Sequence, residues 1–396
     1  MRFPEFSGEW KMCTIGELTT KVGSGVTPRG GEAVYKTEGH PFVRSQNVGL
    51  GNLLLDDIAF IDEETHLRQK NTELQFNDVL LNITGASIGR SALVDKQIVG
   101  GNVNQHVCII RTKENLVPSF ICSFLLSNYG QRQIDSFQAG GNRQGLNFEQ
   151  IKSIKITIPS KDEQIKIAKL LRAIDKRIAT QNKIIEKLQS LIKGLNDHIL
   201  KNIEGDQVCF ADLGEAYGGL SGKSGDDFGC GDPFITYMNV YQNTYISEND
   251  YELVQIAPDE KQNSVQYGDA LFTLSSETPE EVGMGAVYLG KSQKLYLNSF
   301  CFGVHFHGNR VLPQYIAHFI SSTSFRKAIY PLAQGSTRFN LQKQDFMRMK
   351  FVLPSLEEQK RIATALDALY NHLANEKLLT EQYLLLKQYL LQQMFI

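Results

Sequence analysis

Apolar residues recur at steps of three and four over two long stretches, 161–201 and 362–390. In the first stretch the steps alternate regularly with one polar interruption at Gln181, a pattern typical of a coiled-coil helix. In the second stretch the step from Leu373 to Leu379 is six residues, so we expect the apolar stripe to slip by one position there. The predicted seam comprises Ile167, Leu171, Ile174, Ile178, Ile185, Leu188, Ile192 and Leu195 in the first helix, and Ile362, Leu366, Leu369, Leu373, Leu379, Tyr383, Leu386 and Leu390 in the second.

The two stretches also begin alike. Ile158-Pro-Ser-Lys-Asp-Glu-Gln opens the first, and Leu353-Pro-Ser-Leu-Glu-Glu-Gln opens the second. Ser160 and Ser355 can cap free backbone N–H groups, and the Glu three residues later predicts a capping box. At 1.5 Å per residue the first helix would be about 60 Å long. The matching starts favour a duplicated unit, and the alternative is two unrelated amphipathic helices, each packed on its own domain.

The segments that precede the two helices also match one another. Both contain short strand-like runs separated by glycine-rich turns, and Asp78-Val-Leu in the first corresponds to Asp269-Ala-Leu in the second. We therefore predict an α+β fold with two repeated, β-rich mixed domains and two long helices that pair antiparallel between them. The expected boundaries are 1–157 for the first domain, 158–202 for the central helix, 203–352 for the second domain and 353–396 for the last helix.

Composition narrows the class of protein further. A 396-residue chain with 42% hydrophobic and 21% charged residues suits a two-domain soluble protein. The first residues do not resemble a signal peptide, and no apolar run approaches 18 residues, so we expect a cytoplasmic protein that does not bind membranes. Six widely spaced cysteines without a C-x-x-C pair argue against a metal site and against a disulfide framework.

Net charge is −2, and a basic excess is found only in 161–202, which has 10 basic and 5 acidic residues. If the ligand is DNA, positive charge must be local, or a partner must share the phosphate contacts.

Two short motifs could indicate catalysis, but both are incomplete. Gly218-Gly-Leu-Ser-Gly-Lys-Ser resembles a phosphate-binding loop, yet Tyr217 stands where the first glycine is required. Asp232-Pro-Phe lacks one proline of the tetrad that a base methyltransferase needs. We therefore predict no catalytic residue and no cofactor in this chain, and a self-sufficient enzyme is a disfavoured alternative.

Several further motifs, taken in order, resemble one known family. They are Trp10-Lys with Ile15-Gly-Glu-Leu, the segment 41–48, Leu81-Asn-Ile-Thr-Gly-Ala-Ser-Ile-Gly, Gly141-Asn-Arg-Gln-Gly-Leu-Asn and the two helix starts. Over essentially its whole length the chain resembles the specificity subunits of Type I restriction-modification systems. The resemblance implies a non-catalytic subunit with two target-recognition domains, each of which reads one half of a bipartite, asymmetric double-stranded DNA sequence.

The same resemblance implies the partners. The long helices would space the domains and dock two methyltransferase (M) subunits, and restriction (R) subunits would join that complex. S-adenosylmethionine, ATP and magnesium would be bound by those subunits, which carry the adenine-N6 methyltransferase and ATP-dependent endonuclease activities. A coiled-coil scaffold whose globular ends bind proteins instead of DNA is the alternative, and a steep salt dependence of binding would distinguish the two.

Candidate DNA contacts are polar residues beside predicted turns. Arg can pair with guanine edges and Asn or Gln with adenine, whereas Ser, Thr and Lys mostly contact phosphates. Arg143 and Arg338 are the strongest candidates, because both lie in glycine-led polar loops at equivalent positions. The full set is Thr27, Arg29, Arg44, Gln46, Thr84, Arg90, Asn104, Asn142 and Arg143 in the first half, and Ser221, Lys223, Tyr237, Ser275, Ser276, Asn298 and Arg338 in the second.

Overall fold

The computed structural model describes residues 2–30, 34–138 and 145–395, and the chain divides into two compact units. The first unit consists of Met1–Lys183 together with Leu378–Ile396, and the second consists of Ile184–Lys377. Each unit therefore holds one mixed domain and one segment of each long helix, α5 (Lys161–Lys201) and α11 (Leu356–Gln393). None of the helices in the described ranges is both long enough and apolar enough to cross a membrane.

The first unit is built on a four-stranded antiparallel sheet of order β2-β8-β5-β6 and a three-stranded sheet of order β4-β3-β7. A short antiparallel pair, β1 with β9, closes the domain next to α5. The strands are β1 (Lys11–Thr14), β2 (Thr19–Ser24), β3 (His40–Val43), β4 (Ala59–Ile61), β5 (Val79–Asn82), β6 (Ser91–Leu93), β7 (Asn102–Val103), β8 (Val107–Thr112) and β9 (Lys155–Ile158), and the shorter helices are α1 (Glu63–Arg68), α2 (Pro118–Leu125), α3 (Asn128–Ser136) and α4 (Phe148–Ser153).

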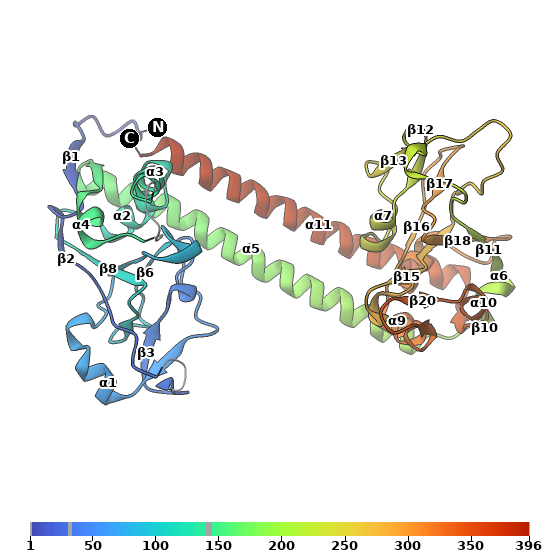
Figure 1. Cartoon of the computed structure of the whole chain (residues 1–396), viewed down its shortest axis with the longest axis horizontal. Helices are drawn as coiled ribbons and strands as arrows, with labels where there is room; N and C mark the ends of the chain where they lie inside the picture. Colours follow the sequence, from blue (N-terminus) through green and yellow to red (C-terminus); the bar gives the residue numbers. More distant parts are fainter. Residues whose placement is uncertain (1, 31–33, 139–144, 396) are drawn as a thin grey trace. The chain divides into compact units, whose positions relative to one another are not determined.

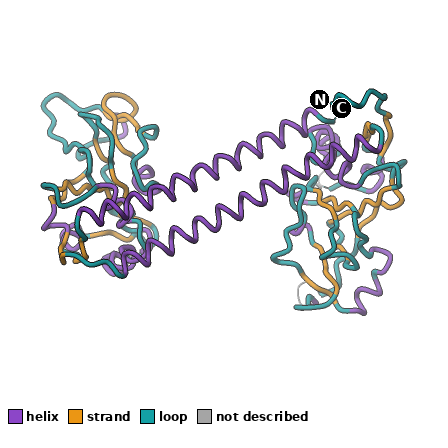
Figure 2. The backbone as a smooth tube through the Cα atoms, turned by 180° about the vertical axis from the view of Figure 1, so that it is seen from behind, coloured by secondary structure: helices purple, strands orange, loops and turns teal. Residues whose placement is uncertain are grey.

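The second unit repeats this plan, with a four-stranded sheet β11-β18-β14-β16, a three-stranded sheet β13-β12-β17 and the closing pair β10 with β21. A further small sheet, β15-β20-β19, is also present. Figure 2 shows the backbone coloured by helix, strand and loop. The strands are β10 (Asp206–Cys209), β11 (Gly214–Gly218), β12 (Phe228–Ile235), β13 (Tyr251–Val254), β14 (Ala270–Thr273), β15 (Ser275–Ser276), β16 (Gly285–Val287), β17 (Tyr296–Leu297), β18 (Cys301–Phe306), β19 (Ala333–Gln334), β20 (Phe339–Leu341) and β21 (Lys350–Leu353), and the shorter helices are α6 (Phe210–Leu213), α7 (Tyr237–Gln242), α8 (Pro313–Ile320), α9 (Thr323–Ile329) and α10 (Lys343–Met347).

Strand β5 shows why each unit has three layers. All four of its residues are buried, so neither face of the sheet is exposed to water there. Val79 and Leu81 pack in one cluster with Phe120 of α2, while Leu80 packs on the opposite face with Val43 of β3. Strand β14 is buried in the same way in the second unit. The four-stranded sheet is thus the middle layer between helices and the smaller sheet.

The two long helices run antiparallel within each unit. In the first unit Asp175 Oδ1 lies 2.6 Å from Lys387 Nζ, and the Arg177 guanidinium lies 5.8 Å from the centre of the Tyr383 ring. Residue numbers therefore increase along α5 in the direction in which they decrease along α11 (Figure 1). In the second unit Leu195 and Ile199 of α5 pack in one cluster with buried residues of the start of α11, such as Ile362 and Leu366, and the direction is again opposite.

Each of the predicted seam positions on α5 is buried or half-buried. On α11 the expected positions Leu379, Tyr383 and Leu390 are half-buried or buried, whereas Leu386 is exposed. From Leu373 onward, positions 376, 380 and 387 are also buried or half-buried. Leu386 is 43% exposed, and the neighbouring Lys387 lies at the seam position instead. A lysine can occupy such a position because its aliphatic stem can pack along apolar surface, and the Lys387 ammonium group pairs with Asp175.

The helix starts are capped as predicted on one side only. Ser160 Oγ accepts a hydrogen bond from the Glu163 N–H at 3.4 Å, and Ser355 Oγ accepts from the Glu358 N–H at 3.3 Å. The carboxylates do not complete the expected boxes. Glu163 binds the Arg2 guanidinium at 2.7 and 2.8 Å, and Glu358 binds Arg361.

The glutamine that follows each glutamate attaches the long helix to its domain. Gln164 is 1% exposed, accepts from the Val117 N–H at 2.9 Å and donates to the Asn115 carbonyl at 3.1 Å. Gln359 is also buried and makes the same two bonds, with the Leu312 N–H at 2.8 Å and the Arg310 carbonyl at 2.9 Å. These buried bonds explain why the Glu-Gln pair recurs at both helix starts.

Candidate nucleic-acid interface

The strand pairing of the first unit brings several polar loops to one edge of its four-stranded sheet. Ser24 at the end of β2 pairs with Cys108 at the start of β8, and Asn82 at the end of β5 pairs with Val107. Ser91, which begins β6, pairs with Leu81. The loops that follow β2 and β5 and those that precede β8 and β6 therefore share this edge.

Loops of the smaller sheet reach the same edge. The Asn104 N–H donates to the Val43 carbonyl at 3.0 Å, and Asn82 Nδ2 donates to the Ser45 carbonyl at 2.8 Å. The sequence candidates Thr27, Arg29, Arg44, Gln46, Thr84, Arg90 and Asn104 all belong to these loops. Asn142 and Arg143 lie outside the described residues.

Arg29 and Arg90 are exposed at this edge, but Arg44 and Gln46 are held by their own unit. Arg44 Nη2 donates to the Asp57 carbonyl at 2.8 Å and to its Oδ2 at 3.1 Å. Gln46 also donates to the Asp57 carboxylate. The side chain of Arg44 is only 14% exposed. Asp57 therefore competes with any DNA base for the hydrogen-bond donors of Arg44 and Gln46.

Asn104 and its counterpart Asn298 each stabilise a turn through the side-chain oxygen. Asn104 Oδ1 accepts from the His106 N–H at 3.0 Å, and Asn298 Oδ1 accepts from the Phe300 N–H at 2.9 Å. This two-residue spacing is that of an Asx-turn. Sequence reasoning missed His106, which lies in that turn and whose Nδ1 is 2.6 Å from Thr84 Oγ1.

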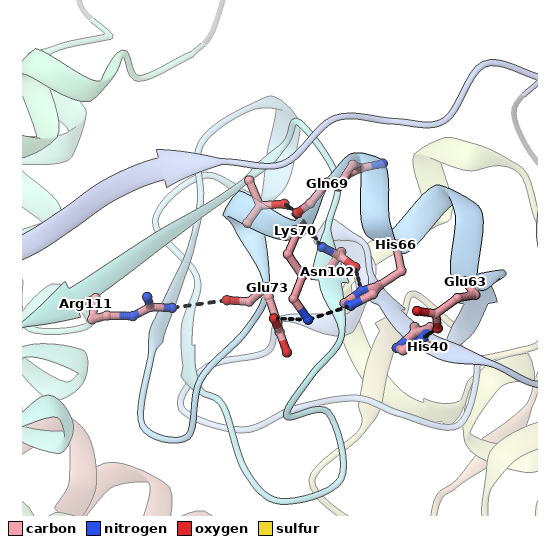
Figure 3. Close-up of polar contacts among 9 residues, drawn as sticks. His40, Glu63, His66, Gln69, Lys70, Glu73, Asn102 and Arg111 are labelled. Atoms are coloured by element: carbon pink, nitrogen blue, oxygen red, sulfur yellow. Dashed lines mark hydrogen bonds and ion pairs between the residues drawn. The ribbon is translucent and has the colours of Figure 1, made fainter.

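A network of buried polar residues supports the loop that carries Thr27 and Arg29. Figure 3 shows Gln69, Asn102 and His66 of this network. Gln69 Oε1 accepts from the Val26 N–H at 3.3 Å, and the Gln69 carbonyl accepts from Asn102 Nδ2 at 3.0 Å. Asn102 Oδ1 in turn lies 2.7 Å from Nδ1 of the buried His66. These buried residues hold the loop in place. The sequence of the loop itself does not indicate that they do so.

The second unit repeats the arrangement with different side chains. β11, β18, β14 and β16 pair in the same register, so the loops after Gly218 and Thr273 and the turn before Cys301 share one edge. Gln262 Oε1 accepts from the Ser221 N–H at 3.1 Å, which matches the support that Gln69 gives in the first unit.

Lys223 is not available as the free phosphate contact that its loop suggested. Its side chain is 8% exposed and pairs with Glu260, and its Nζ donates to the Gln255 carbonyl at 2.6 Å. The hydrogen bonds from Lys223 and Gln262, together with one from the Ala257 N–H, lower the pKa of Glu260 to about 2, so its carboxylate is ionised at neutral pH.

Four of the second-half candidates meet in one cleft of about 310 Å³. Tyr237 OH donates to the Ser275 carbonyl at 2.8 Å, and β15 pairs with β20 through Ser275 and Asn340, which places the neighbouring Arg338 at the cleft. Ser276 is buried and bonds locally to the Thr278 carbonyl. The residues that line the cleft are Tyr237, Met238, Tyr241, Ser275, Ser276, Glu277, Glu281, Phe300 and Arg338.

These observations define a tandem-repeat protein whose two units share one architecture and present polar loops at equivalent sheet edges. Residues 7–190 and 223–382 match the family model described as the Type I restriction modification DNA specificity domain. The chain belongs to this family.

Similar proteins agree with that assignment. The Type I restriction enzyme EcoKI specificity subunit of Escherichia coli (strain K12) is 23% identical over 397 residues, which cover 91% of this chain and 82% of that protein. The solved Type I restriction-modification system S subunit from M. genitalium is 14% identical, with a TM-score of 0.58 over 100% of this chain and 99% of the other. A chain from a solved type I R-M system is 15% identical and has a TM-score of 0.61 over 98% of this chain and 97% of the other. The structural likenesses show the fold.

Proposed function

We propose that this chain is the non-catalytic DNA-specificity subunit of a Type I restriction-modification complex. Each unit reads one half of a bipartite, asymmetric double-stranded DNA target through the loops at its sheet edge. The long helices space the two reading units and dock two methyltransferase subunits, which restriction subunits join. The adenine-N6 methyltransferase and ATP-dependent endonuclease activities, with their S-adenosylmethionine, ATP and magnesium, belong to those subunits.

The observation that carries this proposal is the repeated convergence of polar loops on one edge of equivalent sheets. Both edges are built on the same strand register and the same glutamine support, yet Arg29 and Arg90 are exposed on the first, whereas Tyr237 and Arg338 lie on the second. A shared support beneath unlike surface residues suits two modules that read different half-sites.

Exposed apolar residues on α11 support the docking of a protein partner. Leu384, Leu385 and Tyr389 are 50%, 64% and 49% exposed, and Leu378 and Leu386 are exposed as well. Beside them lies a cleft of about 490 Å³ that Leu50, Ile178, Leu384 and Leu391 help to line within the first unit. Clustered exposed apolar residues of this kind mark protein interaction sites.

Domain exchange tests the modular reading of DNA. Residues 1–157 are replaced by the first domain of another family member, the chain is expressed with its methyltransferase partner, and methylated adenines are mapped genome-wide. We expect one half of the modified sequence to change and the other to stay. A change in both halves, or in neither, would contradict the assignment of one half-site to each unit.

A protein-binding scaffold is the alternative, and ionic strength separates it from a DNA reader. Binding of DNA by the full chain should weaken steeply between 50 and 200 mM salt, by on the order of a hundredfold for about four phosphate contacts. An apolar protein interface would show little change over that range. Methyl transfer by the purified chain without methyltransferase subunits would contradict the non-catalytic assignment.

A further inference from the structure

The cleft of the second unit contains a fixed hydrogen-bond acceptor. Tyr241 OH donates to Glu281 Oε1 at 2.6 Å, and this bond lowers the pKa of Glu281, so the carboxylate is ionised at neutral pH. The Tyr241 ring stacks on that of Tyr237 with centroids 6.0 Å apart, and Tyr237 is itself bonded to the Ser275 carbonyl. A carboxylate has about four lone-pair sites, so Glu281 can accept from a further donor.

The same cleft contains a cationic donor. Arg338 is exposed, and in the described part of the chain no ion pair engages its guanidinium. Its planar fork can donate two parallel hydrogen bonds to one partner. Arg338 is the only lysine or arginine among the described residues that line the cleft.

The surroundings of Arg338 disfavour a phosphate as its partner. Glu277 and Glu281 also line the cleft and repel a phosphate, because like charges in one site oppose each other. Met238 and Phe300 are 52% and 56% exposed and add apolar contact area, which a base edge can use and a phosphate cannot. The chemistry therefore fits a base pair that offers a donor beside strong acceptors.

We propose that this cleft reads a cytosine–guanine base pair in the major groove, with Glu281 accepting from the cytosine N4 amino group and Arg338 donating to guanine O6 and N7. Carboxylates select cytosine and arginine selects guanine, and both groups occur on one C·G pair. This inference rests on the proposed function and assigns a base pair to the second half-site. The first unit has Ser45 and Gly49 at the positions of Tyr237 and Tyr241. It therefore lacks the two tyrosines that hold Glu281 in the second unit.

Selection from a library of randomised duplexes by the full-length chain tests the acceptor. The wild-type chain should prefer C·G at one position of the second half-site by at least about fivefold. Glu281→Gln keeps an oxygen for Tyr241 but adds a donor, so the preference should move toward adenine at that position and nowhere else. Glu280→Gln is the matched control, because it makes the same charge change at an exposed residue outside the lining and should leave the preference intact.

Arg338→Lys tests the donor while keeping its charge. If Arg338 reads guanine, the variant loses the preference at the same position but keeps the salt dependence of the wild-type chain. Wild-type preference in Arg338→Lys, or an equal effect of Glu281→Gln on all duplexes, would overturn the base-pair assignment. A wild-type chain that selects no sequence at all would instead contradict the proposed function. Unchanged thermal melting shows that each variant is folded.

Discussion

The two units place a buried aspartate at the same point of the four-stranded sheet but satisfy it with different partners. Asp78, before β5, accepts from Arg111 Nε and Nη2, both at 2.7 Å. Asp269, before β14, accepts from Tyr217 OH at 2.6 Å and lies 2.8 Å from His305 Nδ1. Arg111 and His305 occupy equivalent positions. Each lies on the neighbouring strand, β8 or β18, directly after the residue that pairs with the first residue of β5 or β14.

The difference shows what the fold requires at this position. Both aspartates are 1% exposed, so each needs donors, yet one unit uses a permanent cation and the other uses a tyrosine and a histidine. Burial raises the pKa of Asp269, whereas the bond to Asp78 raises the pKa of Arg111. The fold therefore constrains hydrogen bonding rather than charge, which leaves each unit free to differ in its electrostatics.

The largest expected effect comes from a substitution at a glycine position that the two units share. A Cβ on Gly25 would lie 1.6 Å from the Val103 carbonyl oxygen, and one on Gly219 would lie 2.0 Å from that of Asn298. Gly25→Ala must displace β7 and should cost about 3 kcal/mol or more. We expect loss of the first half-site in methylation mapping, with recognition of the second retained.

Gly23→Ala is the control, since a Cβ there meets nothing within 4 Å. It should leave stability within about 0.5 kcal/mol of wild type. Equal damage by both substitutions, seen in thermal unfolding of the full chain, would contradict the steric explanation.

Removing the charge of each buried aspartate sharpens the comparison. Asp78→Asn leaves Arg111 without its counter-ion, and because that side chain is 24% exposed we expect a cost of about 2–3 kcal/mol. Asp269→Asn keeps an acceptor for Tyr217 and leaves no permanent cation unpaired, so about 1 kcal/mol is expected. Hydrogen exchange of the β5 and β14 segments, measured in the full chain, reports each cost. Equal costs would show that the permanent charge of Arg111 is not what separates the units.

Acid should affect the second unit more than the first through His318 of α8. Its Nε2 lies 2.7 Å from Asp367 Oδ1, to which Tyr245 also donates, and its ring stacks on Tyr370. Burial lowers the pKa of His318 despite the nearby carboxylate, so the folded chain keeps it neutral where the unfolded chain protonates it. Its contribution to stability is therefore complete above about pH 6.5 and decreases as pH falls below that value.

The size of this effect is limited to about 1.4 kcal/mol per pH unit. We expect exchange in α8 to increase between pH 7.5 and pH 6.0, after correction for the intrinsic rate, and this increase to shrink in His318→Gln. The equivalent position of α2 in the first unit is Ser123, which does not titrate, so α2 is the internal control. An unchanged increase in the variant would exclude His318 as its source.

The sequence predicted the repeat and the long helices well, because helix starts and heptad spacing are local signals. On α11, counting apolar residues finds Leu379, Tyr383 and Leu390, but it includes the exposed Leu386 and overlooks Lys387, which pairs with Asp175 of the other helix. The same limit of local sequence signals applies to the candidate site. Turn-flanking polar residues could be placed at the sheet edges, but their availability depended on distant partners such as Asp57 for Arg44, 13 positions away, and Glu260 for Lys223, 37 positions away.

The smallest effect concerns these same charges. Arg90 is exposed at the edge of the first unit, whereas Lys223 is buried in its ion pair with Glu260. If Arg90 contacts a phosphate, Arg90→Gln should reduce the slope of log binding constant against log salt by about one. Lys223→Gln should leave that slope unchanged, because its charge is already neutralised within the second unit. If only Lys223→Gln reduced the slope, DNA would have to displace Glu260 from Lys223. The second unit would then change its loop on binding, whereas the first would not.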